Sequence, residues 1–205
     1  MKDPVDCRRR RLLLGLAALP VTGLAAGRGT PSASEGPFYP TAGMRFDDID
    51  NDLVRVADRV QQSGGEVMML SGRVLNTDGR PIEGARVEIW QCDSNGRYLH
   101  TGDRGGKARD AGFQGFGHDL SRADGEYRFR TIKPVPYPGR TPHIHVKVLI
   151  DDRSRLTTQF YLDDHPQNQR DWLYRRIPRD QLERVTLKLQ SDAETPQARL
   201  DIILS

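Results

Sequence analysis

Short runs of β-branched and aromatic residues, separated by turns rich in Gly, Asp and Asn, fill this chain from residue 67 to its end. Turns of this kind follow the runs at Asn76-Thr77-Asp78-Gly79 and at Asp93-Ser94-Asn95-Gly96. Runs of four to ten residues with such boundaries are typical of strands at sandwich-like spacing. The predicted strands are Val67–Leu75, Ala85–Gln91, Glu126–Thr131, His143–Ile150, Leu156–Leu162, Val185–Leu189 and Arg199–Leu204. The pattern therefore predicts an all-β fold, an antiparallel β-sandwich.

Little helix is expected in this fold, since only Asp171–Arg176 and Arg179–Arg184 have a helical pattern. The connections His100–His118, Ile132–Pro142 and Asp163–Arg170 are long. Long loops on a rigid scaffold commonly carry function. The sequence thus predicts one sandwich domain with active-site loops at an edge.

The segment His143–Ile150 alternates strictly between two kinds of residue. Ile144, Val146, Val148 and Ile150 share one parity and predict a core-facing side, whereas His143 and His145 share the other. Side chains two apart on a strand point the same way, about 6.5–7 Å apart at Cα, so both imidazoles can reach one metal ion. A His-x-His pair alone is weak support for a metal site, because a structural role is more common.

The formal net charge of +3 comes entirely from the first 27 residues, where Lys2 and Arg8–Arg11 outnumber Asp3 and Asp6. The remainder has equal numbers of acidic and basic residues. A neutral body of this kind predicts no nucleic-acid partner.

The same 27 residues have the features of an export signal. The arginines Arg8–Arg11 precede an apolar run from Leu12 to Ala26, which Gly15 and Pro20 interrupt and which is too short for a comfortable membrane span. Consecutive arginines before leucines predict a twin-arginine-like signal, a periplasmic or secreted protein and no stable membrane anchor after its removal. A disordered basic tail is the alternative.

Three segments are therefore predicted: residues 1–27 as the signal, 28–66 as an N-terminal arm and 67–205 as the β-sandwich catalytic domain. If the signal is removed, Cys92 is the only cysteine left, and no intrachain disulfide can form.

A group of chemically active residues surrounds the His pair. Tyr137 and Arg140 precede it in Pro136-Tyr137-Pro138-Gly139-Arg140-Thr141-Pro142, and Tyr98 follows the turn Asn95-Gly96-Arg97. Together with Thr158-Gln159-Phe160-Tyr161, these motifs resemble the intradiol ring-cleavage dioxygenases of the protocatechuate 3,4-dioxygenase and catechol 1,2-dioxygenase type. The resemblance runs from about Gly36 to Tyr161.

This resemblance implies a role for each matched residue. Tyr98, Tyr137, His143 and His145 would ligate a non-haem Fe³⁺ ion, and Tyr137 would be the ligand displaced when a catechol binds. Arg140 would stabilise negative charge that develops on the substrate, Gln159 would orient groups near the iron, and Gly36 and Pro37 would line the substrate pocket. The reaction implied is cleavage by O₂ between the two hydroxyl-bearing carbons, giving a muconate-type diacid.

Charge supports a ferric ion independently. Fe³⁺ with two phenolates and one hydroxide is neutral, and a neutral cluster costs little to bury. Phenolate is a hard oxygen donor suited to a trivalent ion.

Two departures from the family pattern concern the substrate and the assembly. Gly139 stands where the protocatechuate enzymes carry a bulky aromatic residue, and this should open the pocket. The helical N-terminal domain of catechol 1,2-dioxygenases has no counterpart here. A homo-oligomer, in which a neighbour's arm lines the pocket, is a further hypothesis.

Two other functions are compatible with parts of the sequence. The strands around Gly72-Arg73-Val74 and Asp124-Gly125-Glu126 also resemble transthyretin-like domains, which predicts a non-catalytic binding module with a vestigial metal site. A Zn- or Cu-dependent hydrolase using His-x-His is the third reading, but no third ligand has a recognisable spacing. His100, His118 and His165 match no role and are interpreted as loop or surface residues.

Overall fold

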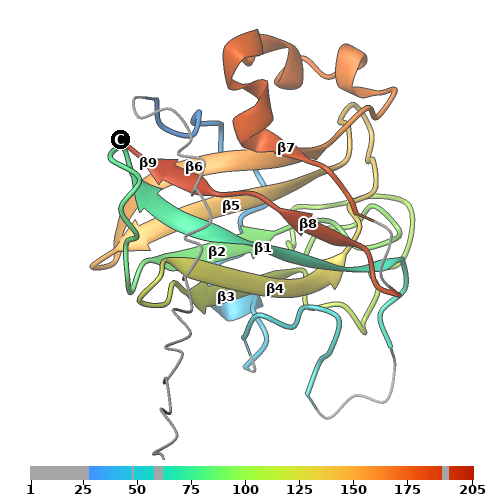
Figure 1. The fold of residues 1–205 in the computed structure, drawn as a ribbon. Helices are drawn as coiled ribbons and strands as arrows, with labels where there is room; N and C mark the ends of the chain where they lie inside the picture. The colour runs from blue at the N-terminus through green and yellow to red at the C-terminus, as the bar shows by residue number, and fades with distance from the viewer. Residues whose placement is uncertain (1–27, 48, 58–61, 191–193) are drawn as a thin grey trace, which may run out of the picture.

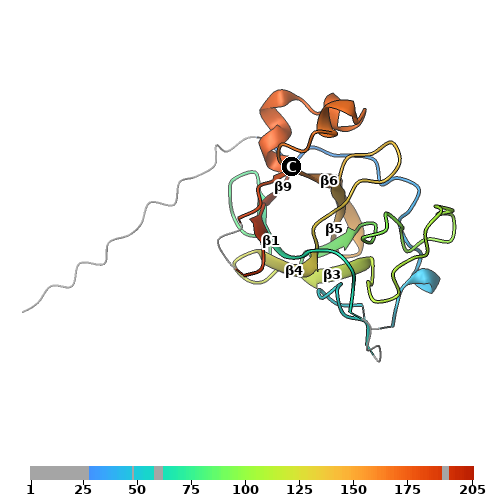
Figure 2. The same ribbon diagram turned by 90° about the vertical axis from the view of Figure 1, so that its right-hand side faces the viewer.

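The computed structural model describes residues 28–47, 49–57, 62–190 and 194–205, and the predicted export signal lies outside them. Two facing sheets form a β-sandwich, with the orange segment of short helices beside β7 (Figures 1 and 2). The four-stranded sheet has β1 at its centre, paired with β4, β8 and β9, and the five-stranded sheet has the order β3-β2-β5-β6-β7. The strands are β1 Val67–Asn76, β2 Arg86–Trp90, β3 Phe116–Leu120, β4 Glu126–Ile132, β5 His143–Ile150, β6 Arg153–Leu162, β7 Thr186–Leu187, β8 Gln197–Arg199 and β9 Ile202–Leu204.

The helical content is low, as predicted, and consists of short 3-10 helices in the described residues. They are η1 Ala42–Met44, η2 Asn168–Arg170, η3 Tyr174–Arg176 and η4 Arg179–Val185. Of the predicted helix Asp171–Arg176 only Tyr174–Arg176 is helical, as the 3-10 helix η3, and the Asp171 carboxylate accepts the backbone N–H groups of Leu173 and Tyr174 in the turn that precedes it. No described helix has the length and apolar character that crossing a membrane requires.

The sheets are mixed rather than purely antiparallel, which corrects one part of the predicted fold. β8 and β9 both run parallel to β1, and β7 runs parallel to β6. The chain between β6 and β7 contains η2 to η4, and a crossover of this length lets it return in the same direction.

The predicted strand Arg199–Leu204 is interrupted at Leu200 and Asp201. The Leu200 carbonyl turns towards Gly72, where a Cβ would lie only 1.8 Å from its oxygen, and accepts a hydrogen bond from the Tyr127 hydroxyl. The Asp201 carboxylate then accepts the Arg73 backbone N–H at 2.9 Å in place of a ladder partner. Hydrogen bonds to one side-chain donor, the Tyr127 hydroxyl, and one side-chain acceptor, the Asp201 carboxylate, therefore divide this segment into β8 and β9.

Strand β3 was not predicted, because its residues lie within the segment assigned to the loop His100–His118 and just beyond it. Phe116, His118 and Leu120 pair with Trp90, Glu88 and Arg86 of β2. Gly115 and Gly117 weaken the strand signal. Gly117 is required by the arm, since a Cβ there would lie 2.4 Å from the Asp50 carbonyl oxygen.

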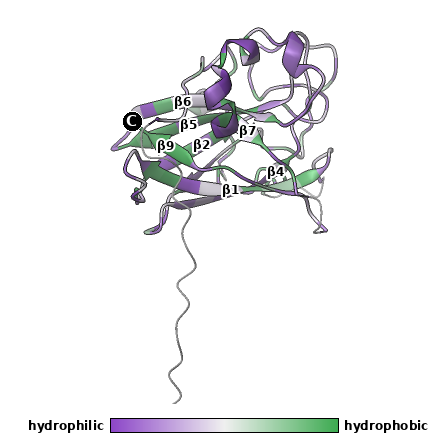
Figure 3. Ribbon diagram, turned by 45° about the horizontal axis from the view of Figure 1, so that its top comes forward, coloured by the Kyte–Doolittle hydropathy of each residue, from purple (hydrophilic) through white to green (hydrophobic). Residues whose placement is uncertain are grey.

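The core lies between the two sheets. Ile144, Val146 and Val148 of β5 are fully buried in it, which confirms the predicted core-facing parity. Leu70 of β1 and Phe129 of β4 belong to the same cluster. Figure 3 shows the corresponding apolar stretches along the facing strands. His143 and His145 therefore point to the opposite side of the five-stranded sheet, where the N-terminal arm (blue) and the loops after β2 (green) lie (Figure 2).

Candidate metal centre

Three donor atoms converge on the outer face of the five-stranded sheet. The Nε2 atoms of His143 and His145 lie 3.1 Å apart, and the Tyr98 hydroxyl lies 3.4 Å from the first and 3.2 Å from the second. All three side chains are buried. Ligands held at about 2.0–2.2 Å from one ion lie roughly 3 Å from one another, so this spacing fits a shared metal ion.

His143 is oriented by the loop that precedes β5. Its Nδ1 donates to the Thr141 carbonyl oxygen at 2.7 Å, which leaves the Nε2 lone pair free to bind a cation. Burial and the positive charge of Arg140 lower the pKa of His143 to about 3. The imidazole is therefore neutral at neutral pH, as a metal ligand must be.

His145 is held by packing. Its ring stacks on the indole of Trp90, and Gly36 of the arm covers its edge, where a Cβ would lie 3.4 Å from His145 Cε1. Burial, the neighbouring His143 and Arg140 lower its pKa well below the usual value. Among the described residues its Nδ1 has no hydrogen-bond partner.

Tyr98 is placed by the turn after β2. The Asp93 carboxylate accepts the backbone N–H groups of Asn95 and Arg97, and Asp103 accepts the backbone N–H of Tyr98 at 2.7 Å. Burial, more than the neighbouring Cys92 and Tyr137, raises the pKa of the Tyr98 phenol well above its usual value. A buried phenolate here would therefore require a bound cation.

Tyr137 lies beside this triangle. Its ring meets Tyr98 edge-on at 5.3 Å between centroids and His143 at 5.6 Å. Its hydroxyl oxygen accepts from Arg140 Nη1 at 3.4 Å. Burial raises its pKa, and the Arg140 charge acts in the opposite direction. The loop that carries both residues turns at Gly139, where φ is +82°.

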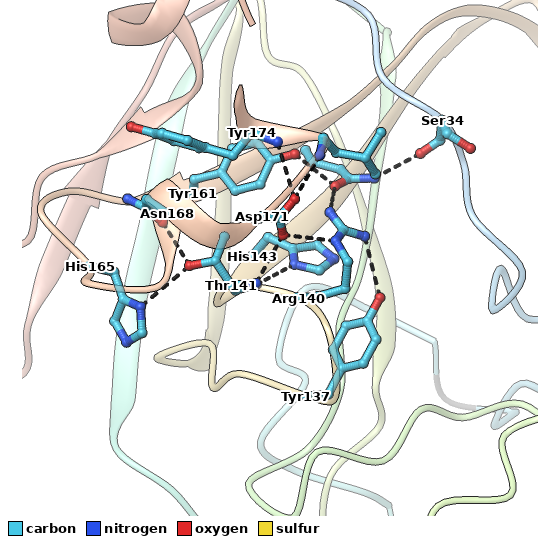
Figure 4. A network of polar contacts seen from close by, with 12 residues as sticks. Ser34, Tyr137, Arg140, Thr141, His143, Tyr161, His165, Asn168, Asp171 and Tyr174 are labelled. Carbon is cyan, nitrogen blue, oxygen red and sulfur yellow. Dashed lines mark hydrogen bonds and ion pairs between the residues drawn. The ribbon is translucent and has the colours of Figure 1, made fainter. Parts of the chain in front are cut away.

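Arg140 links Tyr137 to Gln159, the residue that the resemblance predicts to orient groups near the iron. Arg140 Nη2 donates to Gln159 Oε1 at 2.6 Å, and Figure 4 shows the guanidinium between Tyr137 and Asp171. Gln159 Oε1 also accepts from the Tyr161 hydroxyl, and Gln159 Nε2 donates to the Ser34 carbonyl of the arm. Gln159 thus joins the arginine, the sheet and the arm.

Asp171 completes this network but was not predicted. It is 1% exposed and accepts a hydrogen bond from Arg140 Nε at 2.8 Å. In the sequence it stands at the start of a predicted helix, 31 residues after Arg140, with no motif of its own. A carboxylate on a helical pattern is ordinarily solvated, so only the fold reveals this pairing.

The arm contributes differently at its two predicted substrate-binding residues. Gly36 has φ +75° and lies against His145, as described above, whereas Pro37 is exposed. The next residue, Phe38, stacks on Tyr98 with centroids 5.0 Å apart. The arm therefore covers one side of the three donor atoms.

The remaining histidines lie away from the three donors. His118 is on β3 opposite Glu88, His100 packs near Phe38, and His165 lies 3.3 Å from the Thr141 hydroxyl. No group of three or more His, Cys, Asp and Glu side chains within the described ranges could hold a metal ion. A metal at this place would depend on tyrosine oxygen, which favours a hard cation over zinc.

A cavity of about 400 Å³ opens beside the loop 136–141. Tyr137, Gly139 and Arg140 line it on one side, and Gln167, Arg170 and Asp171 on the other. A Cβ at Gly139 would have no atom within 4 Å, so this position leaves space open.

Residues 34–205 match the family model described as Dioxygenase. The protocatechuate 3,4-dioxygenase beta chain of Burkholderia cepacia is 35% identical over 168 residues, which cover 76% of this chain and 72% of that one. Catechol 1,2-dioxygenase 1 of Acinetobacter lwoffii is 30% identical over 156 residues, which cover 67% of this chain and 48% of that protein. The present chain thus spans about half to three quarters of the length of these two relatives.

Solved structures agree with this match. The dioxygenase domain of a dioxygenase carbohydrate-binding protein fusion from Streptomyces sp. SirexAA-E shares 30% identity at a TM-score of 0.65, covering 87% of this chain and 99% of that one. An intradiol ring-cleavage dioxygenase from Tetranychus urticae has a TM-score of 0.68 at 21% identity over 87% of this chain and 95% of that chain, which supports the fold alone. The family match over residues 34–205 and these relatives show that the chain belongs to the intradiol ring-cleavage dioxygenases.

Proposed function

We propose that this protein is a non-haem Fe³⁺ dioxygenase that cleaves a catecholic ring with O₂ between its two hydroxyl-bearing carbons, giving a muconate-type diacid. The observation that carries the proposal is the convergence of the Tyr98 hydroxyl with the Nε2 atoms of His143 and His145. Tyr137, beside Tyr98 and His143, would be the fourth ligand. When bound, the ferric ion would act as a Lewis acid towards the catechol oxygens.

The tyrosines would provide both charge balance and proton transfer. Two phenolates reduce the net charge that the buried site must carry. Tyr137 is more accessible than Tyr98, and its oxygen already accepts from Arg140. That oxygen is therefore suited to take a proton from an incoming catechol hydroxyl.

Arg140 would stabilise negative charge that develops on the substrate ring. Its Nη1 is directed towards the Tyr137 oxygen, and its Nε and Nη2 are held by Asp171 and Gln159. A guanidinium held in this way needs little reorganisation when charge develops. Gln159 would act through Arg140, since its carbonyl oxygen accepts from that residue.

The first test is a visible absorption spectrum of the purified, iron-loaded protein before and after addition of catechol without oxygen. A tyrosinate-to-iron band that shifts with catechol, followed by oxygen uptake and ring cleavage in air, is the expected result. A colourless protein that retains no iron after reconstitution would refute the proposal and favour a transthyretin-like binding module.

We further propose that residues 1–27 direct export to the periplasm or outside the cell, as the arginines before an apolar run suggest. Cell fractionation and N-terminal sequencing test this. Substitution of Arg8–Arg11 by lysine should retain the precursor in the cytoplasm, whereas unchanged export would contradict a twin-arginine signal.

A further inference from the structure

The Asp171 carboxylate is the meeting point of four hydrogen bonds. Oδ2 accepts from Arg140 Nε at 2.8 Å and from the Thr141 backbone N–H at 2.9 Å. Oδ1 accepts the backbone N–H groups of Leu173 at 2.9 Å and Tyr174 at 3.1 Å. One side of the carboxylate thus holds the loop before β5, and the other side fixes the carboxylate to its own turn.

The contact with Arg140 sets the direction of the guanidinium. A planar guanidinium held at Nε by a carboxylate presents its two terminal nitrogens in a fixed orientation. Here these nitrogens reach the Tyr137 hydroxyl at 3.4 Å and Gln159 Oε1 at 2.6 Å. Figure 4 shows Asp171 on the side of Arg140 away from Tyr137.

The contact with Thr141 extends to a candidate metal ligand. Thr141 is held by its N–H to Asp171 and by its hydroxyl to Asn168 Oδ1 at 2.7 Å. Its carbonyl oxygen accepts from His143 Nδ1 at 2.7 Å. The position of this carbonyl determines how the His143 ring turns, and hence where its Nε2 points.

We infer that Asp171 is a positioning residue of the active site, which acts through Arg140 on the substrate and through Thr141 on His143. This inference rests on the proposed function. Asp171 is only 1% exposed and lies 31 residues after Arg140 in the sequence. Its carboxylate forms its described hydrogen bonds with the loop before β5 and with its own turn, as a positioning role requires.

The test compares Asp171→Asn with a matched control, Asp201→Asn. Asp201 also binds an arginine side chain, at 3.2 Å, and a backbone N–H, at 2.9 Å, but it does so on β1, away from the site. Both variants are loaded with iron, and their urea unfolding, visible spectra and kcat and KM for catechol are measured. Arg140→Gln and the double variant Arg140→Gln/Asp171→Asn complete a double-mutant cycle.

Positioning predicts that Asp171→Asn lowers kcat about 10²-fold with a smaller change in KM, because a misplaced catalytic group costs about this much. It also predicts a shifted tyrosinate-to-iron band without substrate, because Asp171 acts on His143 through Thr141, and a loss in the double variant smaller than the product of the two single losses, because part of the effect of Asp171 passes through Arg140. Asp201→Asn should lose stability only. The inference would be overturned if Asp171→Asn and Asp201→Asn lowered kcat equally, or if the tyrosinate-to-iron band of Asp171→Asn did not shift. It would also be overturned if the loss of kcat in the double variant equalled the product of the two single losses.

The band separates this inference from the proposed function, since it requires no turnover. If the wild-type protein binds iron but does not cleave catechol, a shifted band in Asp171→Asn still supports positioning. If Asp171→Asn does not fold, Asp171→Glu keeps the charge while moving the carboxylate by one methylene. That variant should fold, bind iron and show a lowered kcat with a shifted band, and wild-type values would overturn the inference.

Discussion

The indole of Trp90 stacks on the imidazole of His145, with ring centroids 4.7 Å apart and planes 11° from parallel. The two residues are cross-strand partners on β2 and β5. The stack fixes the plane of the His145 ring, which leaves its Nε2 directed at His143 Nε2, 3.1 Å away. A neutral aromatic partner thus orients a candidate metal ligand that has no hydrogen bond at Nδ1 within the described residues.

Replacing Trp90 by Leu should therefore weaken iron binding about 10- to 100-fold, the usual effect of losing a group that orients a metal ligand. Iron affinity measured by competition with a chelator checks this. The control is Trp172→Leu, because Trp172 is 54% exposed and lies on the surface. An equal loss in both variants would contradict an orienting role for Trp90.

Tyr98→Phe should abolish the visible tyrosinate band or reduce it strongly, and should lower iron retention, because the variant lacks one of three converging donors. Tyr127→Phe is the matched control. Its hydroxyl is also buried and bonded, to the Leu200 carbonyl at 2.6 Å, but it lies in the other sheet. Tyr127→Phe should cost about 1–3 kcal/mol of unfolding free energy and leave the spectrum unchanged.

Ile144→Ala should destabilise the fold by about 2–5 kcal/mol, since it leaves a cavity in a packed core. Urea unfolding measures this loss. Leu149 lies on the opposite parity of the same strand and is only partly buried. Leu149→Ala should therefore cost clearly less, and equal losses would contradict the observed orientation of β5.

Gly117→Ala should separate the arm from β3, because the new Cβ would lie 2.4 Å from the Asp50 carbonyl oxygen and 2.6 Å from Leu53 Cδ1. The expected cost is about 1–3 kcal/mol, with faster hydrogen exchange in residues 50–53. Gly106→Ala has no atom within 4 Å of the added Cβ and should be nearly neutral. Wild-type stability in Gly117→Ala would argue against the described path of the arm.

Asp103 should make stability depend on pH in the acid range. Although burial opposes it, hydrogen bonds from the backbone N–H groups of Tyr98 and Gly105, together with Arg97, lower the pKa of this carboxyl in the folded state. Its contribution is therefore complete above the unfolded pKa near 3.9 and is lost as the pH falls through the lower folded pKa. Urea unfolding at several pH values from 2 to 6 measures this. The unfolding free energy should change less with pH in Asp103→Asn than in the wild-type protein.

The β5 strand and its two faces were predictable, because strict alternation of β-branched residues is a local property of the chain. The same alternation placed His143 and His145 on one side. The motifs that contain Tyr98, Tyr137 and Arg140 indicated the family and the set of site residues. Each of these signals lies within a few residues of sequence.

Strand β3 and the directions of β7, β8 and β9 were not predictable in this way. Gly115 and Gly117 weaken the sequence signal of β3. The need for glycine at position 117 is explained only by the arm, which passes over it. The direction of a strand depends on the path of its connection through space. The pattern of residues within a strand gives no information about that path.

The β-sandwich class, the core face of β5 and most of the residues at the site could be predicted from the sequence alone. The contact of Asp171 with Arg140, the stacking of Trp90 on His145 and the packing of Gly36 against His145 could be learned only from the folded chain. The reason is physical: periodicity and ligand type belong to neighbouring residues, whereas these contacts join segments that are distant in the chain. They form only when the sheet, the arm and the turn after η2 pack together.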